Sequence, residues 1–152
     1  GISKYPIKNK KFGIFKHTIN NKKCPLIRGF DDEFWVPHSR HTTIFRSEIL
    51  NFRELEIISE SDDAGVYIVA TKDGKQVFVT GHSEYDLTTL MDEYNRDKQK
   101  GLDVGIPQNY FPDDDPSKKP MIKWNSHSTL LFANWINYYV YQITPFKIED
   151  ID

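Results

Sequence analysis

Two ionisable side chains directly follow an apolar run near the middle of the sequence. Residues 77–79 (VFV) predict a buried strand, and Gly81 allows the backbone to turn sharply where that strand ends. His82 and Glu84 come next, two positions apart. A histidine beside a carboxylate is the pair of general base and orienting partner that activates a nucleophile. The simpler alternative is a histidine that only follows a strand and a solvated glutamate, and these residues alone favour neither.

No nucleophile for such a base is evident in the sequence. Neither Gly-x-Ser-x-Gly nor Gly-x-Cys-x-Gly, the patterns that place a nucleophile on a strained turn, occurs anywhere. The single cysteine, Cys24, lies in a lysine-rich segment before a proline. We therefore expect it to be an ordinary small side chain near the surface.

Two other interpretations of the chain compete with nucleophilic catalysis by His82. Imidazole and carboxylate groups are common metal ligands, but the candidates match no compact ligand motif, and we expect no metal. These candidates are His38, His41, His82, Glu84 and Asp86. The other possibility is a domain without chemistry that binds a partner through an aromatic C-terminal helix, and composition alone favours it.

Length and composition limit the classes of protein that fit. A chain of 152 residues is the size of one ordinary domain, and its net charge of −2 disfavours nucleic acid or an anionic membrane as a partner. We expect neither a signal peptide nor a membrane span, and one cysteine favours a reducing cytoplasm. The sequence begins with glycine rather than methionine, so we expect a processed chain or a piece of a longer one.

The apolar pattern predicts a sheet that leads into His82. Strands are predicted at residues 12–15, 33–36, 55–58, 66–70 and 77–80, with a short helix near residues 44–50. Residues 1–11 and 38–42 are expected to be irregular, because the first stretch is basic and Pro37 should end the second strand. Asp73 and Gly74 predict a two-residue hairpin turn, so the last three strands should form an antiparallel meander.

The pattern changes to a helical period after His82. Asp86 is a suitable N-cap for a helix that Gly101 ends, and residues 102–120 form a long loop, which is usually functional or packs against the fold. A second helix begins near Ser126 and should end before Pro145. Its apolar and aromatic residues cover nearly every face, so we expect it to be buried within the subunit or at an interface.

Four longer segments resemble the homoserine O-succinyltransferase/O-acetyltransferase family of methionine biosynthesis. The segments are residues 34–42 (FWVPHSRHT), 79–86 (VTGHSEYD), 109–116 (NYFPDDDP) and 131–142 (LFANWINYYVYQ). The resemblance covers essentially the whole chain in the same order. It implies an α/β fold of the class I glutamine amidotransferase-like type, a flavodoxin-like three-layer sandwich, of which residues 1–152 would be the C-terminal half only.

The resemblance also implies a reaction and a set of site residues. The family transfers an acyl group from acyl-CoA, through a cysteine thioester, to the hydroxyl of L-homoserine. By resemblance His82 is the general base, Glu84 is its acidic partner, and Lys10, Ser39 and Arg96 contact substrate. Ser83 stands where many members have proline, a difference that we expect to be tolerated.

The family's nucleophilic cysteine lies before the segment that begins at Gly1, and Cys24 does not replace it. We therefore predict that this chain alone is inactive. No cofactor besides the co-substrate acyl-CoA is expected, and the intact enzyme should be a cytoplasmic homodimer. Succinyl-CoA and acetyl-CoA both remain open as donors. The alternative is a non-catalytic amidotransferase-like interaction module.

Overall fold

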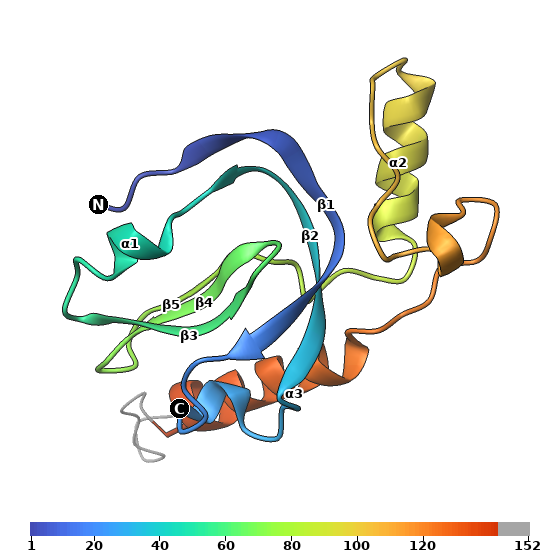
Figure 1. Cartoon of the computed structure of the whole chain (residues 1–152). Coiled ribbons are helices and arrows are strands. Elements are labelled where there is room, and N and C mark those ends of the chain that lie inside the picture. Colours follow the sequence, from blue (N-terminus) through green and yellow to red (C-terminus); the bar gives the residue numbers. More distant parts are fainter. Residues whose placement is uncertain (143–152) are drawn as a thin grey trace, which may run out of the picture.

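The protein folds around one five-stranded antiparallel sheet with the strand order β2-β1-β3-β4-β5. The structure, a computed structural model, describes residues 1–142. In Figure 1 the long strands β1 and β2 curve over the other three, α2 lies towards one end, and α3 lies along the opposite side. The elements are β1 (Tyr5–Ile19), η1 (Pro25–Ile27), β2 (Glu33–Thr43), α1 (Arg46–Ile49), β3 (Leu55–Ser61), β4 (Gly65–Thr71), β5 (Val77–Val79), α2 (Thr89–Gln99), η2 (Pro112–Asp114), α3 (Asn125–Trp135) and η3 (Ile136–Val140).

The first two strands are much longer than the sequence predicted. β1 already begins at Tyr5, and β2 continues through Pro37 to Thr43, so the expected irregular segments 5–11 and 38–42 are strand. Pro37 is tolerated because β2 is an edge strand of the sheet. The Pro37 carbonyl points to the side away from β1, and there it accepts a hydrogen bond from the His82 N–H at 2.8 Å. The missing N–H of the proline therefore costs the sheet no hydrogen bond.

The predicted meander from β3 to β5 is confirmed. The strands pair antiparallel in sequence order, although the hairpin between β4 and β5 closes with a Thr71 N–H to Gln76 carbonyl bond around a longer loop than the predicted two residues. The prediction that β5 is buried was wrong. It is the edge strand of the sheet, and the side chains of Phe78 and Val79 are 49% and 42% exposed.

Helix α2 and the loop after it pack against the middle of β1. The helix begins at Thr89 rather than at Asp86, so the predicted N-cap was wrong, whereas Gly101 does end it. The predicted long loop packs against the fold: Gln108 exchanges backbone hydrogen bonds with β1 at Phe12 and Ile14. Tyr110 and Phe111 of the same loop are buried with Leu90 and Tyr94 of α2.

The C-terminal helix is only partly buried by the described residues, so complete burial within the subunit is not found, and burial at an interface stays a prediction. Leu131 and Asn134 of α3 face the core, but Phe132, Trp135 and Ile136 are 39–45% exposed. The α-helix passes into a short π-helical segment at Ile136–Val140. The predicted end at Pro145 lies outside the described residues.

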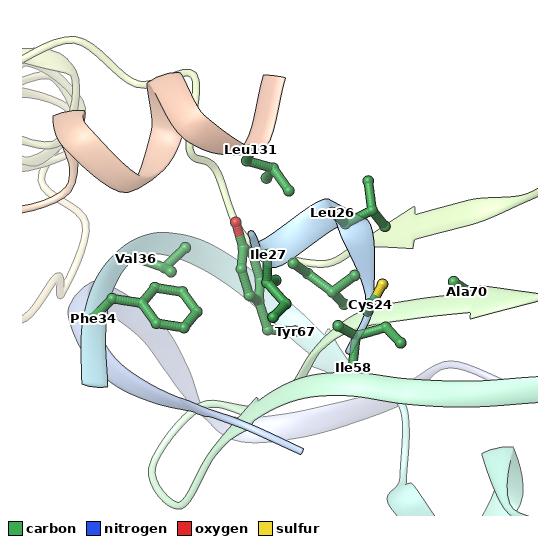
Figure 2. Packing of buried hydrophobic residues seen from close by; sticks show 10 residues of the cluster. Cys24, Leu26, Ile27, Phe34, Val36, Ile58, Tyr67, Ala70 and Leu131 are labelled. Carbon is green, nitrogen blue, oxygen red and sulfur yellow. The ribbon is translucent and has the colours of Figure 1, made fainter. Parts of the chain in front are cut away.

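The core beside the sheet is shared between the η1 turn, the strands and α3. Figure 2 shows Leu26 and Ile27 of η1 packed between Ile58, Tyr67 and Leu131. Two further clusters lie under α2 and under α1. Across residues 1–142, every helix is too short or too polar to cross a membrane.

Candidate active site

His82 and Glu84 lie on the turn that follows β5 and contact each other directly. The Nδ1 atom of His82 is 2.8 Å from Oε1 of Glu84, and the imidazole ring stacks on the Tyr85 ring with 4.4 Å between centroids and 9° between planes. The His82 side chain is 34% exposed and that of Glu84 is 57% exposed. The carboxylate therefore orients the ring, and the Nε2 atom is left for proton transfer.

The turn needs glycine at position 81 because of space. A Cβ atom there would lie 2.7 Å from Cγ1 of Val36 and 3.0 Å from both Cε1 and Nε2 of His38. The Gly81 backbone thus rests directly on the β2 side chains. The next residue is tied to the same strand, because the His82 N–H donates to the Pro37 carbonyl at 2.8 Å.

Ser83 fastens the inner side of the turn. Its hydroxyl lies 2.5 Å from the hydroxyl of Tyr67, and its carbonyl accepts a hydrogen bond of 2.5 Å from the hydroxyl of Ser128 on α3. In Figure 2 the Tyr67 hydroxyl points out of the core cluster on the side of α3. Burial raises the pKa of Tyr67 to about 12, so it stays a neutral phenol. A proline at position 83 would not provide the side-chain hydroxyl that meets Tyr67.

A wide groove of about 1120 Å³ begins at His82 and Glu84. One wall is the open edge of β5 with Phe78 and Val79, and the other is α3 and η3, with Phe132 and Trp135 among the residues that line it. These apolar side chains are 42–49% exposed. The groove therefore combines a hydrogen-bonded histidine–carboxylate pair with a large apolar surface that the described residues leave uncovered.

The three residues that the sequence assigned to substrate binding meet at Glu93 of α2. The ammonium of Lys10 lies 2.6 Å from Oε1 of Glu93, and the hydroxyl of Ser39 donates to the same oxygen at 2.8 Å. The Nη2 atom of Arg96 is 3.8 Å from that oxygen and pairs more closely, at 2.7 Å, with Asp97. Lys10 and Glu93 are only 15% and 18% exposed.

Sequence reasoning missed Glu93, although its spacing of three residues from Arg96 on a helix is a signal that could have found it. The polar cluster and the His82 pair are distinct. Tyr85, whose ring stacks on His82, is affected by both: burial, followed by the charges of Glu93 and Glu84, raises the pKa of its hydroxyl. Within the described part of the chain, the groove at His82 is lined by none of Lys10, Ser39 and Arg96.

The remaining candidates have other surroundings. Cys24 is buried in the core with its sulfur 3.6 Å from the Tyr139 hydroxyl, so the expectation of a surface position was wrong. His38 is fully buried, and its Nε2 atom lies 3.2 Å from Nε2 of His17, whereas His41 is exposed. In residues 1–142 the structure contains no group of three or more His, Cys, Asp or Glu side chains that could hold a metal ion.

Comparison with known sequences places the chain in a defined group. The sequence model of a family described as homoserine O-succinyltransferase matches residues 1–146. The chain is 59% identical to a homoserine O-acetyltransferase of Brevibacillus brevis over 99% of its own length and 49% of that protein. For the homoserine O-acetyltransferase of Clostridium novyi the identity is 58%, over 97% of this chain and 49% of the relative. The chain thus spans about half the length of the curated relatives it matches.

Solved structures agree on the fold. A glutamine amidotransferase from Thermotoga maritima superimposes with a TM-score of 0.58 and 17% identity, over 90% of this chain and 54% of that one. A glutamine amidotransferase from Methylobacillus flagellatus gives a TM-score of 0.59 and 11% identity, over 90% and 55% of the two chains. The predicted fold class, an α/β fold of the class I glutamine amidotransferase-like type, is therefore confirmed, and the chain covers about half of each of these structures.

Proposed function

Because this chain belongs to the homoserine O-succinyltransferase family, we propose that it is the C-terminal part of an acyltransferase acting on L-homoserine. The observation that carries the proposal is the bond of 2.8 Å between Nδ1 of His82 and Glu84 at the mouth of the groove. This pair holds the imidazole ring in one orientation, with Nε2 available to take and return a proton.

The proposed reaction is a double displacement through a cysteine of the complete enzyme. The cysteine sulfur attacks the thioester carbonyl of acyl-CoA, and the CoA thiolate leaves, with His82 accepting the cysteine proton and returning it to CoA. The hydroxyl oxygen of L-homoserine then attacks the new thioester while its proton passes to Nε2 of His82. The cysteine thiolate leaves and takes that proton back, so acyl-CoA and homoserine become O-acylhomoserine and CoA.

Lys10, Ser39 and Arg96 are proposed to bind L-homoserine. Two cationic side chains suit the carboxylate of an amino acid, and a serine hydroxyl can hydrogen-bond near the reacting oxygen. Glu93 supports this assignment because it holds the Lys10 ammonium and the Ser39 hydroxyl at one oxygen. The Tyr85 ring stacks on His82, and the charge of Glu93 raises the pKa of the Tyr85 hydroxyl.

The cysteine is proposed to belong to a companion segment of the complete polypeptide. The relatives are about twice as long as this chain, and an uncovered apolar groove lies where the His82 pair needs a reaction partner. We expect the complete protein to use succinyl-CoA or acetyl-CoA and to be a homodimer in the cytoplasm. The donor is a matter for experiment, since the family description says succinyl and the relatives' names say acetyl.

Mass spectrometry of the acyl-enzyme tests the proposal. The complete polypeptide, mixed with acetyl-CoA or succinyl-CoA, should gain the mass of one acyl group from one of the two donors. Addition of L-homoserine should remove that mass and release O-acylhomoserine. The 152-residue chain treated in the same way should gain no mass.

Two results would contradict the proposal in different ways. A thioester on Cys24 would show that the chain carries its own nucleophile. A complete polypeptide that forms no acyl-enzyme with either donor would favour the non-catalytic interaction module, which the exposed aromatic side chains of α3 would then serve.

A further inference from the structure

Two fully buried histidines lie beneath the turn that carries His82, and the reaction proposed above does not use them. His17 of β1 and His38 of β2 are each 0% exposed. Their rings are stacked with 5.1 Å between centroids and 9° between planes, and their Nε2 atoms are 3.2 Å apart. A hydrogen bond at that distance between two imidazoles requires a proton on one of the two nitrogens only.

The partners at the two ends decide where each proton lies. The Nδ1 atom of His17 is 2.9 Å from the Phe15 carbonyl, which can only accept, so Nδ1 carries a hydrogen. At the other end Nε of Arg40, which can only donate, is 3.4 Å from Nδ1 of His38, so that nitrogen is bare.

Both rings are uncharged at neutral pH, and this fixes the direction of the hydrogen bond between the two histidines. Burial lowers the pKa of His17 to about 4 and that of His38 to about 2. A neutral ring has a single N–H, so Nε2 of His38 donates and Nε2 of His17 accepts. All the hydrogen bonds then run in one direction, from Arg40 to His38, to His17 and to the Phe15 carbonyl.

Further bonds hold the first donor in place. The Arg40 guanidinium also donates to the Thr42 carbonyl at 2.5 Å and to the Ala64 carbonyl at the end of the β3–β4 hairpin. The chain of hydrogen bonds therefore ties β1, β2 and the start of β4 together beneath the turn.

The histidine pair is in contact with the turn on two sides. The Gly81 backbone rests on the His38 ring, since a Cβ there would lie 3.0 Å from Nε2 and Cε1. The Tyr67 ring packs on the His17 ring with 4.9 Å between centroids, and its hydroxyl meets Ser83. Of the two neighbours of His82 along the chain, Gly81 thus rests directly on His38, and Ser83 is connected to His17 through Tyr67.

We propose that His38 and His17 are positioning residues. As two neutral rings joined by hydrogen bonds that all run in one direction, they support the turn from below and hold the His82–Glu84 pair at the groove. The expected effect on kcat rests on the proposed function. The expected tautomers of the two histidines rest on the hydrogen-bond geometry. The two histidines touch no substrate; they act through Gly81 and Ser83.

The first test is spectroscopic and needs no activity. Long-range proton–nitrogen correlation spectra of the complete polypeptide, labelled with ¹⁵N-histidine, report which ring nitrogen carries the proton. At pH 7 we expect His17 protonated only at Nδ1 and His38 only at Nε2. The opposite tautomer at either ring, or a charged ring, would overturn the proposal. This result stands even if the complete polypeptide proves to have no acyltransferase activity.

The second test compares two variants of His38. His38→Phe keeps an aromatic ring but removes both hydrogen bonds, so we expect kcat for homoserine acylation to fall about 10–100-fold. KM for homoserine should change less than about two-fold, because side chains alternate between faces along a strand and Ser39 is on the other face. His38→Gln places an N–H where Nε2 lies and keeps the bond to His17, so it should recover most of kcat.

The matched control is His41→Phe, because His41 is an exposed histidine of the same strand. Its kcat, and the ¹⁵N signals of His82, should equal those of the unaltered protein, whereas the His82 signals should shift in His38→Phe. Full kcat in His38→Phe together with a loss in His38→Gln would show that only ring packing matters. Equal losses in the two variants would show that the hydrogen bond to His17 does not restore kcat. Either result would overturn the proposal. If His38→Phe fails to fold, the tautomer spectra and the His38→Gln kinetics still decide it.

Discussion

The inner and outer sides of the turn from Gly81 to Glu84 differ sharply in how tightly the described residues pack against them. On the inner side, the backbone rests on His38 and Val36, and Ser83 is bound by both Tyr67 and Ser128. On the outer side, His82 and Glu84 bind each other and face a groove whose apolar walls are 42–49% exposed.

This difference indicates how the site is built. Several contacts within residues 1–142 hold the turn that carries His82, whereas these residues leave the apolar surface beside the proposed reactive edge of His82 uncovered. A catalytic side chain held by rigid neighbours needs little reorganisation when a reactant arrives. Within the described residues, the turn that carries His82 is packed on its inner side, and the groove on its outer side is open.

The largest effect should come from the outer side. His82→Asn in the complete polypeptide removes the proton acceptor, and kcat for homoserine acylation should fall about 10²–10⁴-fold. Stopped-flow assay of CoA release measures it, with His41→Asn as the control for an exposed histidine. If His82→Asn retained full activity, the division of the turn into a support and a reactive side would be wrong.

The buried histidines on the inner side should make the free energy of unfolding depend on pH. The folded-state pKa values of His17 and His38 are lowered, to about 4 and about 2, so the unfolded chain binds protons first as the pH falls below about 6.5. The free energy of unfolding should be flat above pH 7 and should decrease by about 2 kcal/mol per histidine between pH 6.5 and 5.

Urea unfolding of the chain at half-unit pH steps measures this decrease. The window lies above the range in which the carboxylates titrate, so their contribution is small there. Replacement of exposed His41 by phenylalanine should leave the pH dependence unchanged. A constant free energy of unfolding from pH 7 to 5 would mean that the two buried histidines are not neutral in the folded state.

The smallest expected effects come from two substitutions, one on each side of the turn, that are compared through the free energy of unfolding. Gly81→Ala on the inner side places a Cβ 2.7 Å from Val36, and the free energy of unfolding should fall by about 1–3 kcal/mol. Phe78→Ser on the outer side removes a half-exposed ring, and the change should stay within about 0.5 kcal/mol. Urea titration of both variants of the chain makes the comparison, and equal losses would remove the distinction between the two sides.

Local patterns predicted the elements that depend on local rules. The antiparallel meander and the end of α2 at Gly101 are confirmed, because a hairpin and a helix end are governed by the nearest residues, although the loop around Asp73 and Gly74 is longer than the two residues predicted. The start of β1 and the passage of β2 through Pro37 were missed. Both depend on the pairing of two distant strands, which no window of the sequence contains.

The candidate site divides in the same way. His82 and Glu84 were found because they are two residues apart on one turn, and their hydrogen bond needs little else. Glu93 was missed, since its partners Lys10 and Ser39 are 83 and 54 residues away along the chain. The pairing of His17 with His38 was also missed, because two histidines on different strands give no pattern in the sequence.

The sequence by itself therefore determined the family, the fold class and the adjacency of His82 and Glu84. These follow from residue types and spacings over short stretches. Only the tertiary structure decided that Lys10, Ser39 and Arg96 meet at Glu93, and that buried histidines support the turn. The physical reason is that packing and long-range hydrogen bonds depend on which strands lie side by side, and burial then sets the charge of the side chains between them.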